Sequence, residues 1–316
     1  MKSGFFKVYS SFDEFQANNH DQVVAWADLD IMSKAVRNHF LLQHVRRGGT
    51  SVGDFYYRFM PRPMNICGTR TGILVNVQLH GEEYPTKYSV KCHHFGMSSF
   101  YQKASPPDIR EIFCYKLLEV IEVGPAVQFI ISKEGVGNKI SVYIATKWRD
   151  DFIPLSDLNK EEDINVEALV QLLLLKVLFN IDNLHADNCQ WNGTNTAAII
   201  SLMPIPCAAH QDVKEVLLGQ HRMNWNHAPA DLLFEKCSTE RFLEIVKKWL
   251  QEWDLLSKID KAAALIKHER DRVKMLENDF RMIEESEYTV AMDLDEYLDA
   301  VKSNVKNLTS ALGLNV

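Results

Sequence analysis

One stretch, residues 168–206, constrains this 316-residue chain more than any other. Apolar residues cover nearly every side over residues 169–179, broken by only two polar residues. The run is too short to cross a bilayer, so it predicts a helix buried in a sizeable core. A loop of nine residues follows, 180–188, which holds three asparagines, two aspartates and a histidine. Polar loops held by a rigid core are typical places for binding and catalytic groups.

Composition and charge exclude several classes of protein. Hydrophobic residues make up 46% of the chain, and the net charge of −7 argues against general nucleic-acid binding through a basic surface. The six cysteines are scattered and form no CxxC pair, so neither a disulfide framework nor a zinc site is expected. No apolar run reaches about 18 residues, and the N-terminus lacks a signal-peptide core. We therefore expect no membrane span and an intracellular location, cytoplasmic or nuclear.

Four segments are expected along the chain. Residues 1–64 are predicted to form an N-terminal helical extension, because apolar residues recur at helical spacing over residues 24–45. The remaining segments are a small lobe of strands, a helical large lobe and a helical C-terminal extension, at residues 65–147, 148–256 and 257–316.

The small lobe is predicted to hold two hairpins and one helix. Alternating and β-branched residues predict strands that pair as hairpins, at 73–79 with 87–92 and at 127–131 with 139–146. Between them, residues 105–108 carry the capping side chain and the prolines typical of a helix start, with Ser105 as the cap. The order is thus strands, helix, strands, connector, buried helix, polar loop and a short strand over residues 197–203.

The chain after residue 206 is predicted to be helical. Amphipathic segments lead to a long charged helix over residues 257–285 and a terminal helix over residues 294–312. The preferred interpretation is that their apolar stripe packs on the protein's own body. The alternative is a coiled coil that binds a partner. The polar-aromatic run at residues 224–227 is expected to be an exposed loop.

Taken together, these elements resemble the protein-kinase-like fold in its atypical branches: aminoglycoside phosphotransferases, HipA-type kinases and phosphatidylinositol 4-kinases. The resemblance covers about residues 65–256. It implies an α+β, two-lobed fold with a mainly antiparallel β small lobe, a helical large lobe and a helical C-terminal extension.

Three matches carry the resemblance in the small lobe. The segment Tyr88-Ser-Val-Lys91 is similar to the third strand of the family, whose lysine holds the α- and β-phosphates of ATP. Glu111 is similar to the glutamate of the following helix, which pairs with that lysine. Ile144 and Thr146 stand where the hinge would offer its backbone to the adenine.

Two further matches lie in the large lobe. Residues 183–188 resemble the phosphotransferase loop D-L-H-x-x-N, and the strand at 197–204 takes the place of the metal-binding strand and turn. The resemblance implies catalytic roles for Asp182, His185 and Asn188. Asn188 would also bind a metal, with Asp187 beside it as a substitute ligand.

Two departures remove charges on which phosphoryl transfer depends. Asn183 stands at the aspartate position, where an amide cannot accept a proton, and Asp182 next to it is the available substitute. Ser201 stands where the family places a metal-binding aspartate, and residues 191–211 contain neither Asp nor Glu. Because Mg²⁺ prefers anionic oxygen ligands, the sequence leaves two alternatives: ATP without tightly bound Mg²⁺, or no cofactor.

Plain structural interpretations stand beside these roles. Lys91 could be a strand lysine paired to a carboxylate, with Glu119 as the rival of Glu111. His185 could brace the backbone through hydrogen bonds, and Asp182 and its neighbours could cap and stiffen a tight loop.

The preferred hypothesis is a catalytically impaired kinase-like protein, a pseudokinase, that works as a protein-interaction scaffold or regulatory subunit. Its expected partners are proteins, bound through the C-terminal helices, or a second copy of the chain. One alternative is an active atypical kinase that transfers phosphate from ATP to a small molecule, lipid or protein. Another is a non-kinase α/β binding module.

Overall fold

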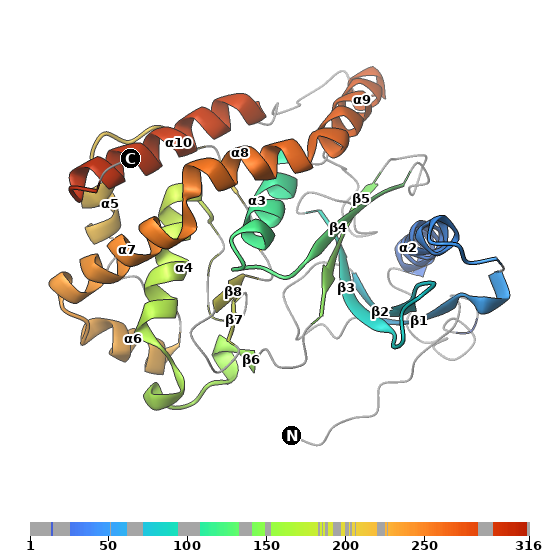
Figure 1. Cartoon of the computed structure of the whole chain (residues 1–316), viewed down its shortest axis with the longest axis horizontal. Helices are drawn as coiled ribbons and strands as arrows, with labels where there is room; N and C mark the ends of the chain where they lie inside the picture. The colour runs from blue at the N-terminus through green and yellow to red at the C-terminus, as the bar shows by residue number, and fades with distance from the viewer. Residues whose placement is uncertain are drawn as a thin grey trace. The chain divides into compact units, whose positions relative to one another are not determined.

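The structure is a computed structural model of the chain (Figure 1). By internal contacts the chain divides into two compact units. Unit 1 comprises Met1–Pro107, Ala126–Arg149 and Val273–Ser286, and unit 2 comprises Asp108–Pro125, Asp150–Arg272 and Glu287–Val316. The residues described are 14, 26–50, 52–61, 72–93, 108–132, 141–148, 153–182, 184, 186, 189–191, 197–199, 202, 204–205, 207–219, 225, 227–283 and 293–314.

Unit 1 is built on a five-stranded antiparallel sheet with the order β1-β2-β3-β5-β4. The β2–β3 and β4–β5 pairs confirm the two predicted hairpins. Gly81, in the turn between β2 and β3, has a φ of 82°, a conformation that glycine adopts without steric cost. The strands are β1 (Tyr56–Pro61), β2 (Gly72–Gln78), β3 (Thr86–Cys92), β4 (Val127–Ser132) and β5 (Ser141–Lys147).

Helix α2 (Trp26–Arg46) packs on one face of this sheet, as Figure 1 shows. The apolar residues of α2 and of the facing strand positions form one buried cluster, which includes Met32, Val36, Phe40, Phe59, Val75 and Val90. Each such side chain stabilises the unit by roughly 1.5–3 kcal/mol relative to its exposed state. At the margin of the cluster, Gln43 donates a hydrogen bond to Gln128 of β4 at 2.7 Å.

The boundaries of the two units differ from the predicted segments. Strand β1 lies within the predicted helical extension, yet it pairs along its length with β2. Helix α3 (Ile109–Val120), predicted within the small lobe, belongs to unit 2. Strand pairing and packing between distant segments decide these boundaries, and neither leaves a local mark in the sequence.

Unit 2 is mainly helical and also holds a small antiparallel sheet, β6-β7-β8. The α+β class is therefore confirmed.

Among the residues that the structure describes, no helix has the length and apolar character to span a membrane. The helices after α3 are α4 (Val166–Phe179), α5 (Val213–Gly219), α6 (Ala228–Glu235), α7 (Thr239–Trp253), α8 (Leu255–Leu265), α9 (Lys267–Ile283), which begins in unit 2, and α10 (Leu294–Ala311). The remaining elements are β6 (Ile153–Pro154), β7 (Cys189–Trp191), β8 (Ala197–Ile199) and the 3₁₀ turns η1 (Val52–Asp54, in unit 1), η3 (Leu155–Asp157) and η4 (Glu161–Asp163).

Helix α4 is the predicted buried helix, and nearly all of its residues are buried. It packs against α5, α6, α7, α10 and β8, so that its apolar surface finds partners on every side (Figure 1). The side chain of Asn165 accepts a hydrogen bond from the backbone N–H of Glu167 at 2.7 Å, which caps the first turn. Asn180 ends the helix in the left-handed conformation, with a φ of 48°.

Two predicted helix boundaries are wrong. The cap of α3 is Asp108, whose carboxylate accepts a hydrogen bond from the backbone N–H of Arg110 at 2.9 Å. The predicted cap, Ser105, lies outside the described residues. The expected single helix over residues 257–285 is broken at Ile266, where α8 ends and α9 begins immediately afterwards.

The expected exposed loop at residues 224–227 is also wrong at its aromatic residue. Trp225 is fully buried, and its ring packs edge-on against Phe234 with a centroid distance of 6.3 Å. The carboxylate of Asp231 accepts hydrogen bonds from the backbone N–H groups of Trp225 and His227. Asn224 and Asn226 lie outside the described residues.

Helix α10 is packed into unit 2 against α3, α4, α5 and α8. The hydroxyl of Tyr297, a fully buried residue, donates a hydrogen bond to the carbonyl of Phe179 at 2.6 Å. That hydroxyl has only one proton, so it accepts from the thiol of Cys114 at 3.3 Å. Burial raises the pKa of this thiol to about 12, so the thiol keeps the proton that it donates. The apolar stripe of α10 thus packs on the protein's own body, which is the preferred interpretation of the sequence.

We predict that a side chain at Gly49, a buried position just after α2, is unfavourable. A Cβ there would lie 2.1 Å from the ring of His44, whereas a Cβ on Gly219 would meet open space. We expect Gly49→Ala to lower the free energy of unfolding by about 1–3 kcal/mol. Gly219→Ala should leave it unchanged or raise it by up to about 1 kcal/mol. Urea denaturation followed by circular dichroism measures both, and equal effects would contradict the close packing.

We also predict that two asparagines of α10 contribute very unequally to stability. Asn304 is fully buried and bonds to Cys207, Ala208 and the backbone N–H of His210, whereas the half-buried Asn307 donates to the carbonyl of His210. Asn304→Ala leaves buried groups without partners and should cost about 2–4 kcal/mol. Asn307→Ala, the matched control, should stay within about 0.5 kcal/mol of wild type in the same urea titration. Similar losses for both variants would show that the segment 207–210 does not depend on Asn304.

Candidate functional site

Lys91 lies on β3, the third strand of the sheet, as the resemblance implies. Its side chain is 3% exposed. In the antiparallel register Lys91 is opposite Gly72 on one side and Ile144 on the other. Residues opposite one another share a face of the sheet, and a glycine next to Lys91 contributes no side chain to it. The lysine therefore stands on the face opposite α2, beside a position without a side chain.

Thr146 belongs to the same face, because it is two residues beyond Ile144 on β5 and opposite Ser89. Its hydroxyl donates a hydrogen bond to the carbonyl of Ser89 at 3.3 Å. The structure thus brings three of the four predicted cofactor-binding residues, Lys91, Ile144 and Thr146, onto one face of one sheet.

The predicted hinge, however, lies inside β5. Ile144 and Thr146 have β3 on one side and β4 on the other, and their backbone is engaged in the sheet. The sheet pairing persists to Lys147, and the N–H of Trp148 still donates to the carbonyl of Lys87 at 2.8 Å. Hydrogen bonds from these residues to an adenine remain a prediction, which this pairing does not favour.

Glu111 lies in the first turn of α3 and is fully buried. Near it, Arg110 and Asp108 form a buried ion pair with a shortest distance of 2.6 Å. Glu119, the alternative partner for Lys91, forms an ion pair with Lys116, which lies three residues before it on the same helix. Lys91 belongs to unit 1 and Glu111 to unit 2, so the Lys91–Glu111 ion pair stays a prediction.

The polar loop after α4 begins with an anchored segment. Ile181 forms an isolated bridge with Pro204, and the N–H of Ile205 donates to the carbonyl of Asn180 at 3.0 Å. Asp182 follows and is exposed, so its carboxylate is accessible to solvent. Further along, apolar residues point into the core: Leu184, Ala186 and Cys189 are all buried.

The other predicted residues of this region, Asn183, His185, Asp187, Asn188 and Ser201, lie outside the described residues. Their neighbours are nevertheless brought together. Cys189, which directly follows the loop, pairs with Ile199 at the end of β8. The loop and the strand that the resemblance identified as the catalytic and metal-binding segments are therefore adjacent. Within the described part of the chain, no three His, Cys, Asp or Glu side chains gather closely enough to hold a metal ion.

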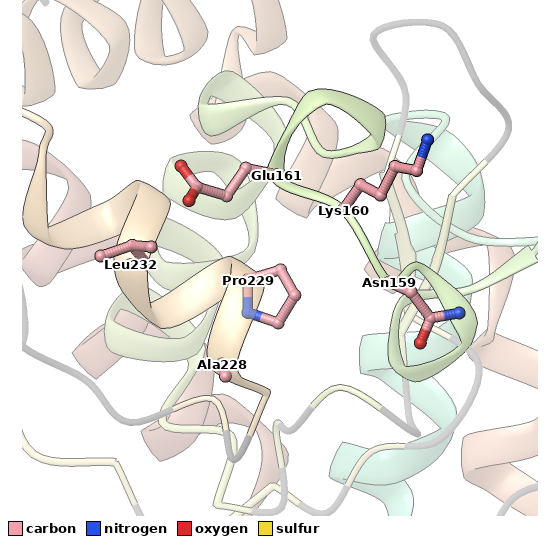
Figure 2. Close-up of a pocket in the computed structure, with 6 residues that line it drawn as sticks. All are labelled: Asn159, Lys160, Glu161, Ala228, Pro229 and Leu232. Carbon is pink, nitrogen blue, oxygen red and sulfur yellow. The ribbon is translucent and has the colours of Figure 1, made fainter.

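A hollow of about 650 Å³ lies elsewhere in unit 2, between the segment 159–161 and the first turns of α6 (Figure 2). Figure 2 shows Glu161 on the side of Leu232 and Lys160 extending away from both. The carboxylate of Glu161 is bound to Lys236 at 2.6 Å. None of the predicted site residues that the structure describes is among those that line this hollow. Its lining residues are Asn159, Lys160, Glu161, Ala228, Pro229 and Leu232.

The sequence did not reveal which residues hold the polar loop in place. Tyr297 fixes the carbonyl of Phe179 at the end of α4, and Asn304 fixes the segment that follows β8. Both residues stand in the apolar stripe of α10, where a polar group is out of pattern. That irregularity was the available signal, but the stripe does not say which segments the polar groups would meet.

No family model and no curated protein matches the chain. Among solved structures, the Neurospora crassa PAN3 pseudokinase is 13% identical, with a TM-score of 0.28 over 89% of this chain and 71% of that chain. A mutant of it is 12% identical, with a TM-score of 0.27 over 88% and 70%. PAN3 (pseudokinase and C-term) in complex with PAN2 (WD40-CS1) is 13% identical, with the same TM-score and coverage as the mutant. At these identities and TM-scores the likeness carries no information on function.

We predict that Lys91 is energetically coupled to Glu111 and not to Glu119. If the buried lysine pairs with Glu111, a double-mutant cycle with Lys91→Met and Glu111→Gln should give a coupling free energy of about 1–3 kcal/mol. The matched cycle with Glu119→Gln should be additive within about 0.5 kcal/mol. The measurement is urea denaturation of the wild type, the three single variants and the two double variants. Additivity in the first cycle would contradict the pair.

Proposed function

We propose that the chain is a kinase-like protein whose capacity for phosphoryl transfer is lost or much reduced, and that it acts by binding other proteins, as a scaffold or regulatory subunit. The order of elements supports the kinase-like part. A strand with a buried lysine, a helix with a buried glutamate, two further strands, a buried helix, a polar loop and a short paired strand follow one another as the resemblance implies.

The observation that carries the loss of activity is a lack of negative charge. Strand β8 and the residues around it, 191–211, contain no carboxylate, although this is where the resemblance calls for the principal metal ligand. A hydroxyl such as that of Ser201 is a much weaker ligand for Mg²⁺ than a carboxylate. Without the ion, the charge that develops on the transferred phosphoryl group is not neutralised.

The residues that remain in the site support binding of a nucleotide without phosphoryl transfer. Lys91 stands buried on a face that also carries Ile144 and Thr146, so an ATP phosphate could still find its cationic partner. Nucleotide bound in this way would depend on lysine and not on metal. The chain would then use nucleotide to stabilise its structure and not as a substrate.

The second candidate is an active atypical kinase, and one observation favours it. Asp182 is exposed directly after the left-handed turn at Asn180, where it is free to take the role of the missing base. In this version Asp187 supplies the metal ligand from the same loop.

The two candidates differ in the effect of the metal, which thermal unfolding measures. An active kinase should be stabilised by ATP much more strongly with Mg²⁺ or Mn²⁺ than without, because a ligand that binds the folded state stabilises it by RT ln(1 + [L]/Kd), and the metal lowers Kd. We expect the pseudokinase to show the same midpoint with ATP alone as with ATP and metal. We also expect no transfer of labelled phosphate to water, to the chain itself or to a mixture of acceptor proteins.

Ser201→Asp is the informative variant, and Ser201→Asn is its uncharged control. If the missing carboxylate is the defect, Ser201→Asp should gain a metal-dependent rise in the unfolding temperature with ATP, and Ser201→Asn should not. Metal-dependent stabilisation or phosphate transfer by the wild-type chain would overturn the proposal and favour the active kinase.

A further inference from the structure

The five strands of unit 1 are basic in a chain that is acidic. They contain Arg58, Lys87, Lys91 and Lys147 but neither Asp nor Glu, whereas the chain as a whole carries a net charge of −7. Lys91 is buried, as described above, and Lys147 is opposite Tyr88, on the face that α2 covers. The other two basic residues of the strands, Arg58 and Lys87, lie on the face opposite α2.

Arg58 and Lys87 stand in one row across the sheet. Asn76 on β2 is opposite Arg58 on one side and Lys87 on the other, so the three side chains share a face. The N–H of Trp148 donates to the carbonyl of Lys87, which continues β5 and extends the row by one residue. Adjacent strands are about 4.8 Å apart, so the two cations have their roots about 10 Å apart.

An aromatic ring lies under each cation. The guanidinium of Arg58 lies 5.5 Å from the ring centroid of Tyr56, and the ammonium of Lys87 lies 4.7 Å from that of Trp148. Tyr56 is 38% exposed and Arg58 is exposed, so this row is open to solvent at the β1 end. Tyr, Trp and Arg are the residues enriched at the energetic centres of protein interfaces, and here they stand on a rigid sheet.

The spacing of the two side-chain roots on the sheet selects a class of partner. In a polyproline II segment, side chains three residues apart lie on the same side and have their roots about 9.3 Å apart, which matches the spacing of the roots of Arg58 and Lys87. Aromatic side chains are also the usual docking surface for such segments. A long polyanion such as single-stranded RNA would be repelled by the net charge of the whole chain, whereas a short acidic segment needs only the local cations.

We propose that the row Arg58–Asn76–Lys87–Trp148, with Tyr56 beside it, is the docking site for an extended acidic segment of a partner protein with two carboxylates three residues apart. This inference rests on the proposed function, because it assigns the partner surface that a scaffold requires. It places that surface on the sheet of unit 1 and not on the C-terminal helix α10, whose apolar face is already packed within unit 2.

Fluorescence anisotropy with labelled synthetic peptides tests the proposal on the full chain. The probe is Pro-Asp-Pro-Pro-Asp-Pro, and the controls are the same peptide with both Asp replaced by Asn and a peptide of equal charge with adjacent aspartates. We expect the probe to bind, the Asn peptide not to bind, and the adjacent-Asp peptide to bind several-fold more weakly. Arg58→Gln and Lys87→Gln should each weaken the probe about tenfold.

The matched control is Lys147→Gln, which removes an exposed cation one residue from Trp148 but on the other face. It should change the affinity less than twofold. No binding of the probe, equal loss in Lys147→Gln, or tighter binding of an octauridine RNA that also depends on Arg58 would overturn the proposal. If the peptide does not bind, the docking proposal fails, but the phosphate-transfer assay is unaffected. If the chain transfers phosphate, the proposed function fails, but the peptide-binding assay is unaffected. The two proposals can therefore be tested separately.

Discussion

The burial of α4 on nearly every side is the constraint on which the rest of unit 2 depends. A helix with no polar face is stable only when other elements cover it, and α5, α6, α7, α10 and β8 cover most of α4. At its ends the chain can present polar groups. At the C-terminal end the carbonyl of Phe179 has no partner within the helix, and the hydroxyl of Tyr297 supplies one. The left-handed turn at Asn180 then directs the chain into the polar loop.

This arrangement makes α10 part of the site's support. Through Tyr297 it joins the start of the polar loop to Cys114 on α3, the helix that carries Glu111. Through Asn304 it holds the segment after β8. These supporting residues are distinct from the predicted catalytic residues, so the proposed loss of charge would leave the scaffold in place. In unit 1 the same sheet face is buried at Lys91 and open at Arg58, so the proposed nucleotide position and the proposed partner surface are separate.

The elements that could be predicted from the sequence are those with a local signal. The apolar run of α4 predicts a buried helix, and the alternation in β2, β3, β4 and β5 predicts strands. The position of Lys91 on the third strand follows from these predictions. Non-local pairing could not be predicted: β1 joins the sheet only because β2 offers it an edge. The break at Ile266 was not predicted because the apolar residues keep their helical spacing across it. The burial of Trp225 was not predicted because its neighbours in the sequence are polar. The end of β5 at Lys147 was not predicted, because a strand end carries little local signal of its own.

The central claim is that the site lacks the negative charge needed to hold a divalent ion against a triphosphate. The most direct measurement is electron paramagnetic resonance of Mn²⁺ titrated into the chain with a non-hydrolysable ATP analogue. We predict that the signal of bound Mn²⁺ is no larger than that of the analogue alone, and that Ser201→Asp adds a protein-bound signal. One tightly bound Mn²⁺ per wild-type chain in the presence of the analogue would contradict the account.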